Sequence, residues 1–274
     1  MNADLTISAG IGKAWADELL LHGFNVLLHG RDPAKLKKTQ NEFAARYPRR
    51  KVETVVADAS SNDHPERIVA EKVKQLPGRL TILINNVGGV NTSPVFVPLA
   101  ETTSEAIDTQ ININARFTVH LTSLLMLELI KNKPGLIIVS GSGAGVFGGP
   151  YLSIYSATKG FCHSFAKTLA AEMVVEGLEN DIEVRCIMIN NTRSQGNKFV
   201  MPFFTIDAKD LVKGMLRQVG DGGSTISHGS WRHLVQTYAL MIWGEKLSRK
   251  FMVGTMRRMR TQEQQKLATE AKAQ

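Results

Sequence analysis

The stretch from Gly135 to Gly160 constrains the fold most strongly, because a strand, a turn and a helix follow one another there. The apolar run at 136–139 predicts a short buried strand. Small residues occupy 140–145, and apolar positions from Ile154 onward recur at helical spacing. The segment therefore predicts a strand whose end faces the start of a long helix.

Three side chains of this stretch predict a proton-transfer site. Tyr155 and Lys159 are four residues apart on the expected helix, so they share one face. A lysine cation beside a phenol favours the phenolate, which eases proton exchange with a substrate. Ser142, at the strand end, can hydrogen-bond the same substrate oxygen. An isolated Tyr-x-x-x-Lys pair is more often plain helix surface, but Ser142 and the glycines between them favour a site for a carbonyl or an alcohol.

The segment Ile154–Lys159, read with Ser142 and with Asn114 upstream, resembles the short-chain dehydrogenase/reductase family. The form Ile-Tyr-Ser-Ala-Thr-Lys is most similar to the branch of 17β-hydroxysteroid dehydrogenases types 3 and 12 and very-long-chain 3-oxoacyl-CoA reductases. The resemblance implies an α/β fold, with a Rossmann-like, doubly wound parallel sheet in a single domain. We expect this catalytic domain to occupy residues 1–230, and a basic amphipathic extension to occupy 231–274.

The resemblance also implies a role for each catalytic residue. Tyr155 gives its proton to the carbonyl oxygen, Ser142 holds that oxygen, and Lys159 grips the nicotinamide ribose. Asn114 holds a water that connects the site to solvent protons. A polar residue on a helix surface is the alternative reading of Asn114, and the nearby Asn112 has some claim to the same role.

The first residues carry a cofactor signature with a defect. Gly10-Ile11-Gly12 opens a predicted helix, where backbone amides and the helix dipole favour a pyrophosphate. The Thr-Gly pair that begins this loop in the family falls on Leu5 and Thr6. Only residues 1–4 precede these positions, so we expect the central first strand to be truncated. A chain start placed too late in the gene model and true divergence are both open explanations.

Two positions bear on the choice of cofactor. Gly30 occupies the place of the acidic residue that binds the ribose of NAD, and Arg31 follows it, which suits the 2′-phosphate of NADP. Asp32 with Pro33 is typical of a helix N-cap. The sequence therefore predicts NADP(H), with a solvated loop cation as the alternative for Arg31. By resemblance Asp58 binds the adenine amino group, and its alternative is an acid at a helix start.

The tetrad Asn85-Asn86-Val87-Gly88 ends another predicted strand. Its amides can tie neighbouring strands together, and Gly88 leaves room for the cofactor. Ser194 stands nearest to the family's cofactor-binding threonine. The cofactor-binding set is Gly10, Ile11, Gly12, Arg31, Asp58, Asn86, Gly88, Tyr155, Lys159 and Ser194.

The net charge of +8 is concentrated near the C-terminus. Between Trp231 and Arg260 there are seven Lys or Arg residues and one Glu, interspersed with large apolar side chains. Contact with an anionic membrane surface and docking on the protein's own core or a partner subunit are equally favoured. No nucleic-acid motif accompanies the charge, so we expect no nucleic-acid partner.

The remaining composition bears on the compartment. Cys162 and Cys186 cannot form a disulfide framework and fit a reducing compartment. No apolar run reaches the roughly 18 residues of a membrane span, and the start does not resemble a signal peptide. We expect the cytosolic side of the endoplasmic reticulum membrane or the cytoplasm, and no secretion.

The activity that these features predict is NADPH-dependent reduction of a ketone on an apolar substrate, of 3-oxoacyl-CoA or 17-ketosteroid type, to a secondary alcohol. We expect a homodimer and no metal. One alternative is a non-catalytic Rossmann-fold protein that binds lipid or membrane, supported by the defective N-terminus. The other is a soluble reductase of a secondary metabolite.

Overall fold

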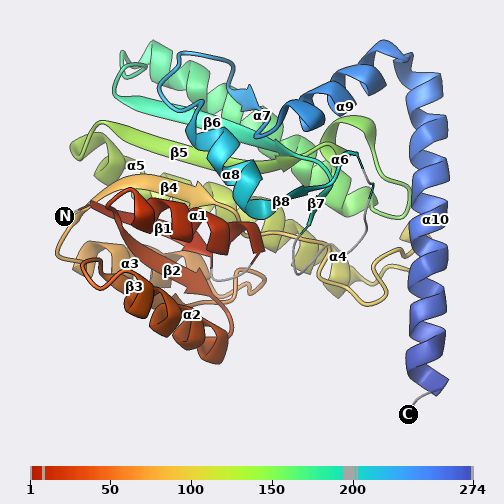
Figure 1. The fold of residues 1–274 in the computed structure, drawn as a ribbon, viewed down its shortest axis with the longest axis horizontal. Coiled ribbons are helices and arrows are strands. Elements are labelled where there is room, and N and C mark those ends of the chain that lie inside the picture. The colour runs from red at the N-terminus through yellow and green to blue at the C-terminus, as the bar shows by residue number, and fades with distance from the viewer. Residues whose placement is uncertain (1, 8–9, 194–200, 202, 273–274) are drawn as a thin grey trace.

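A seven-stranded parallel sheet forms the centre of the protein (Figure 1). The computed structural model describes residues 2–7, 10–193, 201 and 203–272. The strands of this sheet, in spatial order, are β3 (Val52–Val56), β2 (Asn25–Gly30), β1 (Asn2–Ile7), β4 (Arg79–Asn85), β5 (Gly135–Ser142), β6 (Ile182–Ile189) and β9 (Ile226–Ser227). The strand order reverses between β1 and β4, which is the doubly wound arrangement that the sequence predicts.

The expectation of a truncated first strand is wrong. β1 pairs with β2 from Ala3 to Ile7 and with β4 from Asn2 to Leu5, with a register shift after Ala3. Glycine spacing had assigned Leu5 and Thr6 to the turn, but the strand continues through both. Backbone pairing on two sides outweighs the poor strand propensity of Asn and Asp at this position.

Helices cover both faces of the sheet. One face is packed by α1 (Gly10–Leu21), α2 (Pro33–Arg46) and α8 (Ala208–Leu216), around a core that includes Trp15 and Phe43. The other is packed by α3 (Pro65–Gln75), α5 (Phe117–Lys131) and α7 (Ser153–Val175), around Leu121, Leu125 and Cys162. Cys162 and Cys186 are both buried and free, as expected for core residues.

The shorter elements lie mostly at the carboxyl edge of the sheet. They are η1 (Leu99–Glu101), α4 (Ser104–Ile111), η2 (Asn112–Arg116), α6 (Ala144–Phe147), β7 (Thr192–Arg193) and β8 (Ile206–Asp207), and β7 and β8 form a two-stranded parallel sheet of their own. Local sequence signals account for several helix starts. Asp32 accepts a hydrogen bond from the Lys35 N–H at 3.0 Å at the start of α2, which confirms the predicted N-cap.

The helical stretch Ser104–Lys131 is long and apolar enough, by length and composition alone, to cross a membrane. The sequence reading did not identify such a segment. In the structure it packs against the sheet through α5, and its middle turn, η2, is a π-helix. A core helix of a globular domain meets the same criterion, and the packing assigns this stretch to the core.

The chain ends in two helices, α9 (Trp231–Ile242) and α10 (Gly244–Lys272). Figure 1 shows α10 standing upright at one side of the domain, beyond the carboxyl ends of β4 and β5. Met256 is buried where α10 meets the domain. The C-terminal residues are therefore next to the edge of the sheet at which the predicted site residues gather.

Candidate active site

A cleft of about 470 Å³ opens at the carboxyl ends of β4, β5 and β6. We call it the catalytic cleft. The residues predicted from the sequence that line it are Gly10, Ile11, Asn86, Gly88, Ser142, Tyr155 and Lys159. The fold thus brings together three of the four predicted catalytic residues and several of the cofactor set.

Tyr155 and Lys159 lie on the first turns of α7. The Lys159 Nζ lies 5.8 Å from the centre of the Tyr155 ring. Lys159 is buried and donates a hydrogen bond of 2.8 Å to the carbonyl oxygen of Ser140 on β5. Close packing of α6 on α7 fixes this turn, because a Cβ at Gly145 would lie 2.6 Å from the Gly160 nitrogen. The lysine is therefore held in place beside the phenol.

Ser142 ends β5, and the nearby Ser140 is held by Asn86, the residue that follows β4. The Ser140 hydroxyl donates to the Asn86 Oδ1 at 3.1 Å, which ties the two strand ends together. Asn85 instead donates to the Thr122 hydroxyl on α5 at 2.9 Å. The predicted tie between strands is thus made by Asn86, whereas Asn85 anchors a helix.

Asn114 is fully buried in η2, just outside the cleft lining. Its amide exchanges two hydrogen bonds with the main chain of Gly89, at 2.8 and 2.9 Å. A Cβ at Gly88 would lie 2.6 Å from the Asn114 Oδ1 and 3.0 Å from the Lys159 Nζ. Gly88 is thus required for the close approach of both side chains. Asn112, the competing candidate, faces away and donates to Ser60 and Asn62.

The amino terminus of α1 forms the other end of the cleft. Gly10, the first residue of α1, has a φ of 57°, a left-handed conformation that favours glycine. Gly10 and Ile11 line the cleft, whereas Gly12 is buried within the helix. Free backbone N–H groups at a helix start suit a phosphate.

Arg31 and Asp58 follow β2 and β3 at the same edge of the sheet. Arg31 is exposed. Partial burial acts to raise the pKa of Asp58, but hydrogen bonds from Ser60 and the nearby charge of Arg31 outweigh it and lower the pKa. Asp58 is therefore an ionised acceptor, and Ser60 donates to it through both its N–H and its hydroxyl.

The segment after β6 completes the lining of the cleft. Ile189, Asn190 and Thr192 line it. Ser194, the predicted stand-in for the family threonine, lies outside the described residues. Thr192 lines the cleft, although the sequence pointed to Ser194 as the nearest equivalent of the family threonine.

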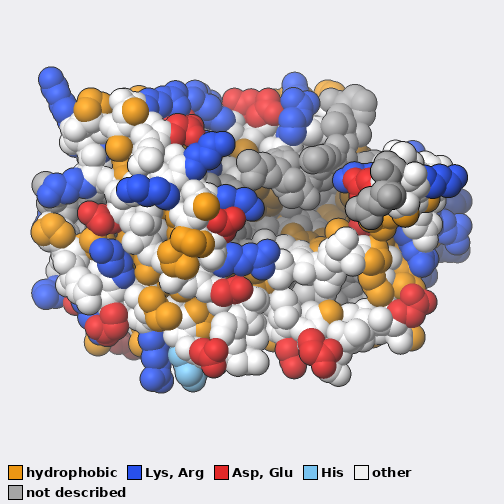
Figure 2. Space-filling model, turned by 90° about the horizontal axis from the view of Figure 1, so that it is seen from below, with side chains coloured by type: hydrophobic (Ala, Val, Ile, Leu, Met, Phe, Trp, Pro, Cys, Tyr) orange, Lys and Arg blue, Asp and Glu red, His pale blue; other side chains and the backbone are white. Residues whose placement is uncertain are grey.

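The C-terminal helix α10 also reaches the cleft, which the sequence did not predict. Met259 lines the catalytic cleft together with Tyr155. The Glu263 carboxylate accepts hydrogen bonds from the N–H groups of Val95 and Phe96 at 2.7 and 3.1 Å. The Arg260 guanidinium lies 4.4 Å from the centre of the Tyr151 ring. Figure 2 shows hydrophobic side chains in the hollow between α10 and the rest of the domain.

A second cavity, of about 160 Å³, continues from the cleft between α6, α9 and α10. It shares Ser142, Ala144 and Met259 with the catalytic cleft. Its other walls are mainly apolar and are formed by residues that include Phe147, Leu240, Phe251, Met252 and Met256. We call it the α10 branch.

The family model for short chain dehydrogenases matches residues 6–202. The chain belongs to the short-chain dehydrogenase family. It is 30% identical over 241 residues to the very-long-chain 3-oxoacyl-CoA reductase of Aspergillus oryzae, covering 85% of this chain and 67% of that protein. A protein of the same description from Coccidioides immitis is 30% identical over 239 residues, covering 86% and 66%. The chain thus spans about two thirds of the length of these relatives.

Solved structures show the same fold. A short-chain dehydrogenase from Sphingobium yanoikuyae, in complex with NADPH, superposes with a TM-score of 0.74 at 22% identity, covering 90% of this chain and 95% of that one. A 7β-hydroxysteroid dehydrogenase superposes with a TM-score of 0.80 at 18% identity, covering 92% and 96%. These likenesses confirm the Rossmann-like fold.

Membership of the family makes the protein an oxidoreductase that binds a nucleotide cofactor and a small-molecule substrate, and the family uses NAD(P)H. The residues fit such a cofactor. The start of α1 offers N–H groups for phosphates, and Lys159 offers a buried cation for a ribose. Among the described residues no group of His, Cys, Asp and Glu side chains could hold a metal ion.

Proposed function

We propose that the protein is an NADPH-dependent reductase that converts a ketone on an apolar substrate into a secondary alcohol. One observation carries the proposal: Ser142, Tyr155 and Lys159 line the same cleft as the glycine start of α1. The candidate proton donor and the backbone N–H groups that can bind a phosphate therefore lie in one cleft.

Each residue then has a step that its position allows. The nicotinamide, when bound, supplies the hydride. Tyr155 donates the proton to the carbonyl oxygen, and the Ser142 hydroxyl orients that oxygen by a hydrogen bond. Lys159, fixed on the Ser140 carbonyl, places its positive charge beside the phenol. Asn114 holds the turn at Gly89, and through it the floor of the cleft.

The preference for NADPH over NADH rests on Arg31. It follows β2, where Gly30 leaves no carboxylate to bind a ribose or to repel a phosphate. Arg31 is exposed directly after the end of β2. A 2′-phosphate in this region would meet a cation.

The apolar character of the substrate rests on the α10 branch. Methionine and phenylalanine side chains line this continuation of the cleft. An apolar cavity of roughly 150 Å³ suffices for a benzene ring in a protein interior, and the branch is of similar size. Methionines suit such a wall because they adapt to irregular ligands. The curated relatives are named as 3-oxoacyl-CoA reductases, which makes an acyl chain the first candidate for this space.

The alternative of a non-catalytic lipid-binding protein drew on a truncated first strand and a missing Thr-Gly pair. The first of these no longer supports it, because β1 is present between β2 and β4. Steady-state oxidation of NADPH at 340 nm tests the choice. A 3-oxoacyl-CoA series and a 17-ketosteroid should be compared, with a small water-soluble ketone as the third class. Turnover of an apolar ketone with NADPH supports the proposal, and no turnover of any ketone would refute it.

We also propose a homodimer through the outer faces of α5 and α7. Leu127 on α5 is 77% exposed, and Leu124 on α5 and Phe161 on α7 are also exposed. A two-fold axis places such a face against itself, which buries both copies. Light scattering after gel filtration should give a dimer mass, and Leu127→Glu should lower it to that of a monomer. A monomeric parent would refute the dimer.

Attachment to an anionic membrane surface is a further part of the proposal. Three residues of α9 are buried against the domain, His233, Thr237 and Leu240, whereas the other large apolar side chains of this helix are exposed. The exposed apolar residues of α9 and the start of α10 are Trp231, Leu234, Val235, Tyr238, Met241, Ile242, Trp243 and Leu247.

Two basic residues, Arg232 and Lys246, lie within this apolar stretch, and five more follow between 249 and 260. Exposed aromatic side chains and cations together match the surface of an anionic bilayer. The protein should sediment with phosphatidylserine liposomes, and high salt should release only part of it. Ile242→Glu should weaken the binding, and the exposed Leu21→Glu should serve as the control. No sedimentation at low salt would refute the attachment.

A further inference from the structure

His163 is a buried histidine that contacts the main chain of Ser142. It lies on α7, one turn beyond Lys159, and is 8% exposed. The N–H of Ser142 donates a hydrogen bond to the His163 Nε2 at 3.2 Å. The family resemblance in the sequence assigned no role to this position.

The main chain of β5 is shaped to admit the ring. A Cβ at Gly141 would overlap the His163 imidazole and would lie 2.8 Å from the Cys186 Sγ. Glycine at 141 therefore permits the close approach of His163 to the strand. The contact depends on a matched pair of residues, one on β5 and one on α7.

The Ser142 N–H lies where pairing within the sheet ends. The pairing of β4 with β5 stops at Asn85 and Val139, three residues earlier. The next amide, that of Gly143, donates to the Ile189 carbonyl on the β6 side at 3.1 Å. His163 thus supplies an acceptor beyond the end of β4. A buried N–H that lost it would be left without a partner or would shift the strand end.

The contact fixes the protonation of the ring. Because the partner is an N–H donor, Nε2 accepts, and the ring proton of a neutral His163 resides on Nδ1. Burial, followed by the charges of Lys159 and Lys167 and by His228, lowers the pKa of His163 to about 4. The acceptor is therefore retained at neutral pH.

We propose that His163 is a positioning residue for Ser142: it holds the Ser142 main chain so that the hydroxyl meets the carbonyl oxygen of the substrate beside Tyr155. This inference rests on the proposed function of Ser142. His163 acts through the strand end and does not touch the substrate, since it is outside the lining of the catalytic cleft.

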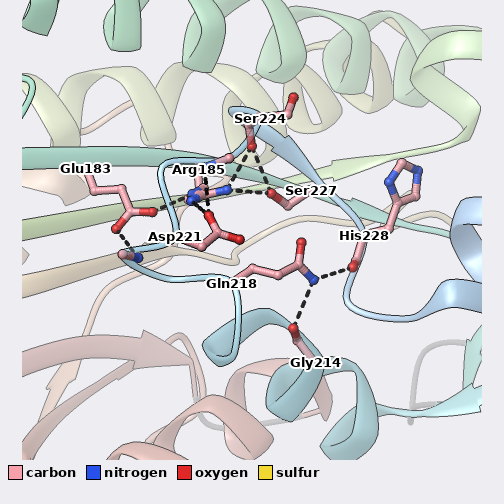
Figure 3. Close-up of polar contacts among 10 residues, drawn as sticks. Glu183, Arg185, Gly214, Gln218, Asp221, Ser224, Ser227 and His228 are labelled. Carbon is pink, nitrogen blue, oxygen red and sulfur yellow. Dashed lines mark hydrogen bonds and ion pairs between the residues drawn. The ribbon is translucent and has the colours of Figure 1, made fainter.

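Behind His163 lies a separate cavity of about 650 Å³, which we call the rear cavity. His163, Lys167, His228 and Tyr238 are among its lining residues. Arg185, on the same wall, is neutralised by Glu183 and Asp221 and also donates to Ser224 and Ser227 (Figure 3). Because His163 lines the rear cavity, removal of its ring would open a space that small solutes can reach through that cavity.

This geometry allows chemical rescue as a test. His163→Ala should lower kcat for ketone reduction by roughly 10- to 100-fold, because a misplaced group costs rate, and should leave the KM for NADPH within about two-fold. Added imidazole should restore part of the lost kcat by entering from the rear cavity. His163→Gln, whose amide oxygen can accept the Ser142 N–H, should keep most of the activity. His228→Ala is the control: it opens the same cavity, and imidazole should not alter its rate.

A second variant and a second measurement keep the test decisive. His163→Leu fills the space without an acceptor, so it should fold and show the same loss of kcat. In ¹⁵N-labelled protein the Ser142 amide should exchange with solvent at least roughly tenfold faster in His163→Leu than in the parent. The inference is overturned if the folded His163→Leu keeps the parent kcat, or if Ser142 exchange is unchanged. The exchange result stands whether or not the parent reduces a ketone, and an inactive parent would refute the proposed function alone.

Discussion

Glu263 holds α10 against the catalytic domain, and its removal should loosen that helix. Its two carboxylate oxygens accept the N–H groups of Val95 and Phe96 at 2.7 and 3.1 Å. Glu263→Gln keeps the length and helix propensity of the side chain. It leaves one amide oxygen for two N–H donors, so one donor loses its partner and the charge is lost.

The magnitude follows from these contacts. Hydrogen bonds to a charged group contribute about 1.5–3 kcal/mol each. Because Glu263 is only partly buried, about 2 kcal/mol is a fair figure for the change. Since 1.4 kcal/mol corresponds to a factor of ten, the open population of this part of α10 should rise roughly 30-fold.

Hydrogen exchange read by mass spectrometry measures this opening directly. Peptides covering residues 257–268 should exchange faster in Glu263→Gln, whereas β5 and α7 should be unchanged. Glu270→Gln is the matched control, because Glu270 is on the same helix and, among the residues that the structure describes, pairs with Lys266 alone, at 3.5 Å on the surface. Equal exchange in Glu263→Gln and the parent would show that other contacts hold α10. Faster exchange in both variants would show that helix charge, not docking, is responsible.

Three further outcomes can be measured. Arg31→Asp should weaken the binding of NADPH far more than that of NADH, because it replaces attraction by repulsion at the 2′-phosphate; equal losses by fluorescence titration would contradict this. Gly88→Ala should weaken the binding of both cofactors, because its Cβ would lie 2.6 Å from the Asn114 Oδ1; unchanged affinities would contradict it, and Gly254→Ala, with no atom within 4 Å of its Cβ and no positive φ, is a control for the loss of a glycine. The free energy of unfolding should fall as the pH drops from 6.5 towards 4. Burial lowers the pKa of His29 to about 4 in the folded protein, so the unfolded chain binds a proton in this range that the folded protein does not. His29 alone should lower the free energy of unfolding by about 2 kcal/mol at pH 5 relative to pH 7.5. The urea midpoints at these two pH values should therefore differ less in His29→Gln than in the parent.

The sequence was sufficient for the parts of the fold with strong local signals. The apolar run at 136–139 and the predicted strand that ends at Asn85 are both strands of the sheet, and the Asp32 N-cap is in place. The spacing of Tyr155 and Lys159 led directly to their shared position in the cleft, because four residues make about one helical turn.

What the sequence did not predict depends on contacts between distant segments. β1 contains Asn2 and Asp4, which are poor strand formers, and it is held by pairing with β2 and β4 on its two sides. Glu263 reaches Val95 across 168 positions, and no local pattern marks such a contact. The sequence leaves the tail open between a membrane and the core. In the structure α10 docks beside the cleft and α9 exposes apolar side chains, and contact with a membrane stays a prediction.

The role of Tyr155 is the central claim, and one substitution tests it most directly. Tyr155→Phe removes only the hydroxyl, and a general acid contributes typically 10²- to 10⁴-fold to a rate. With the best ketone and saturating NADPH, kcat should fall by at least roughly 100-fold while the Kd for NADPH stays within about two-fold. Tyr238→Phe, on α9 and outside the lining of the catalytic cleft, should retain the parent rate. A kcat for Tyr155→Phe within a few-fold of the parent would contradict the account, because another group would then supply the proton.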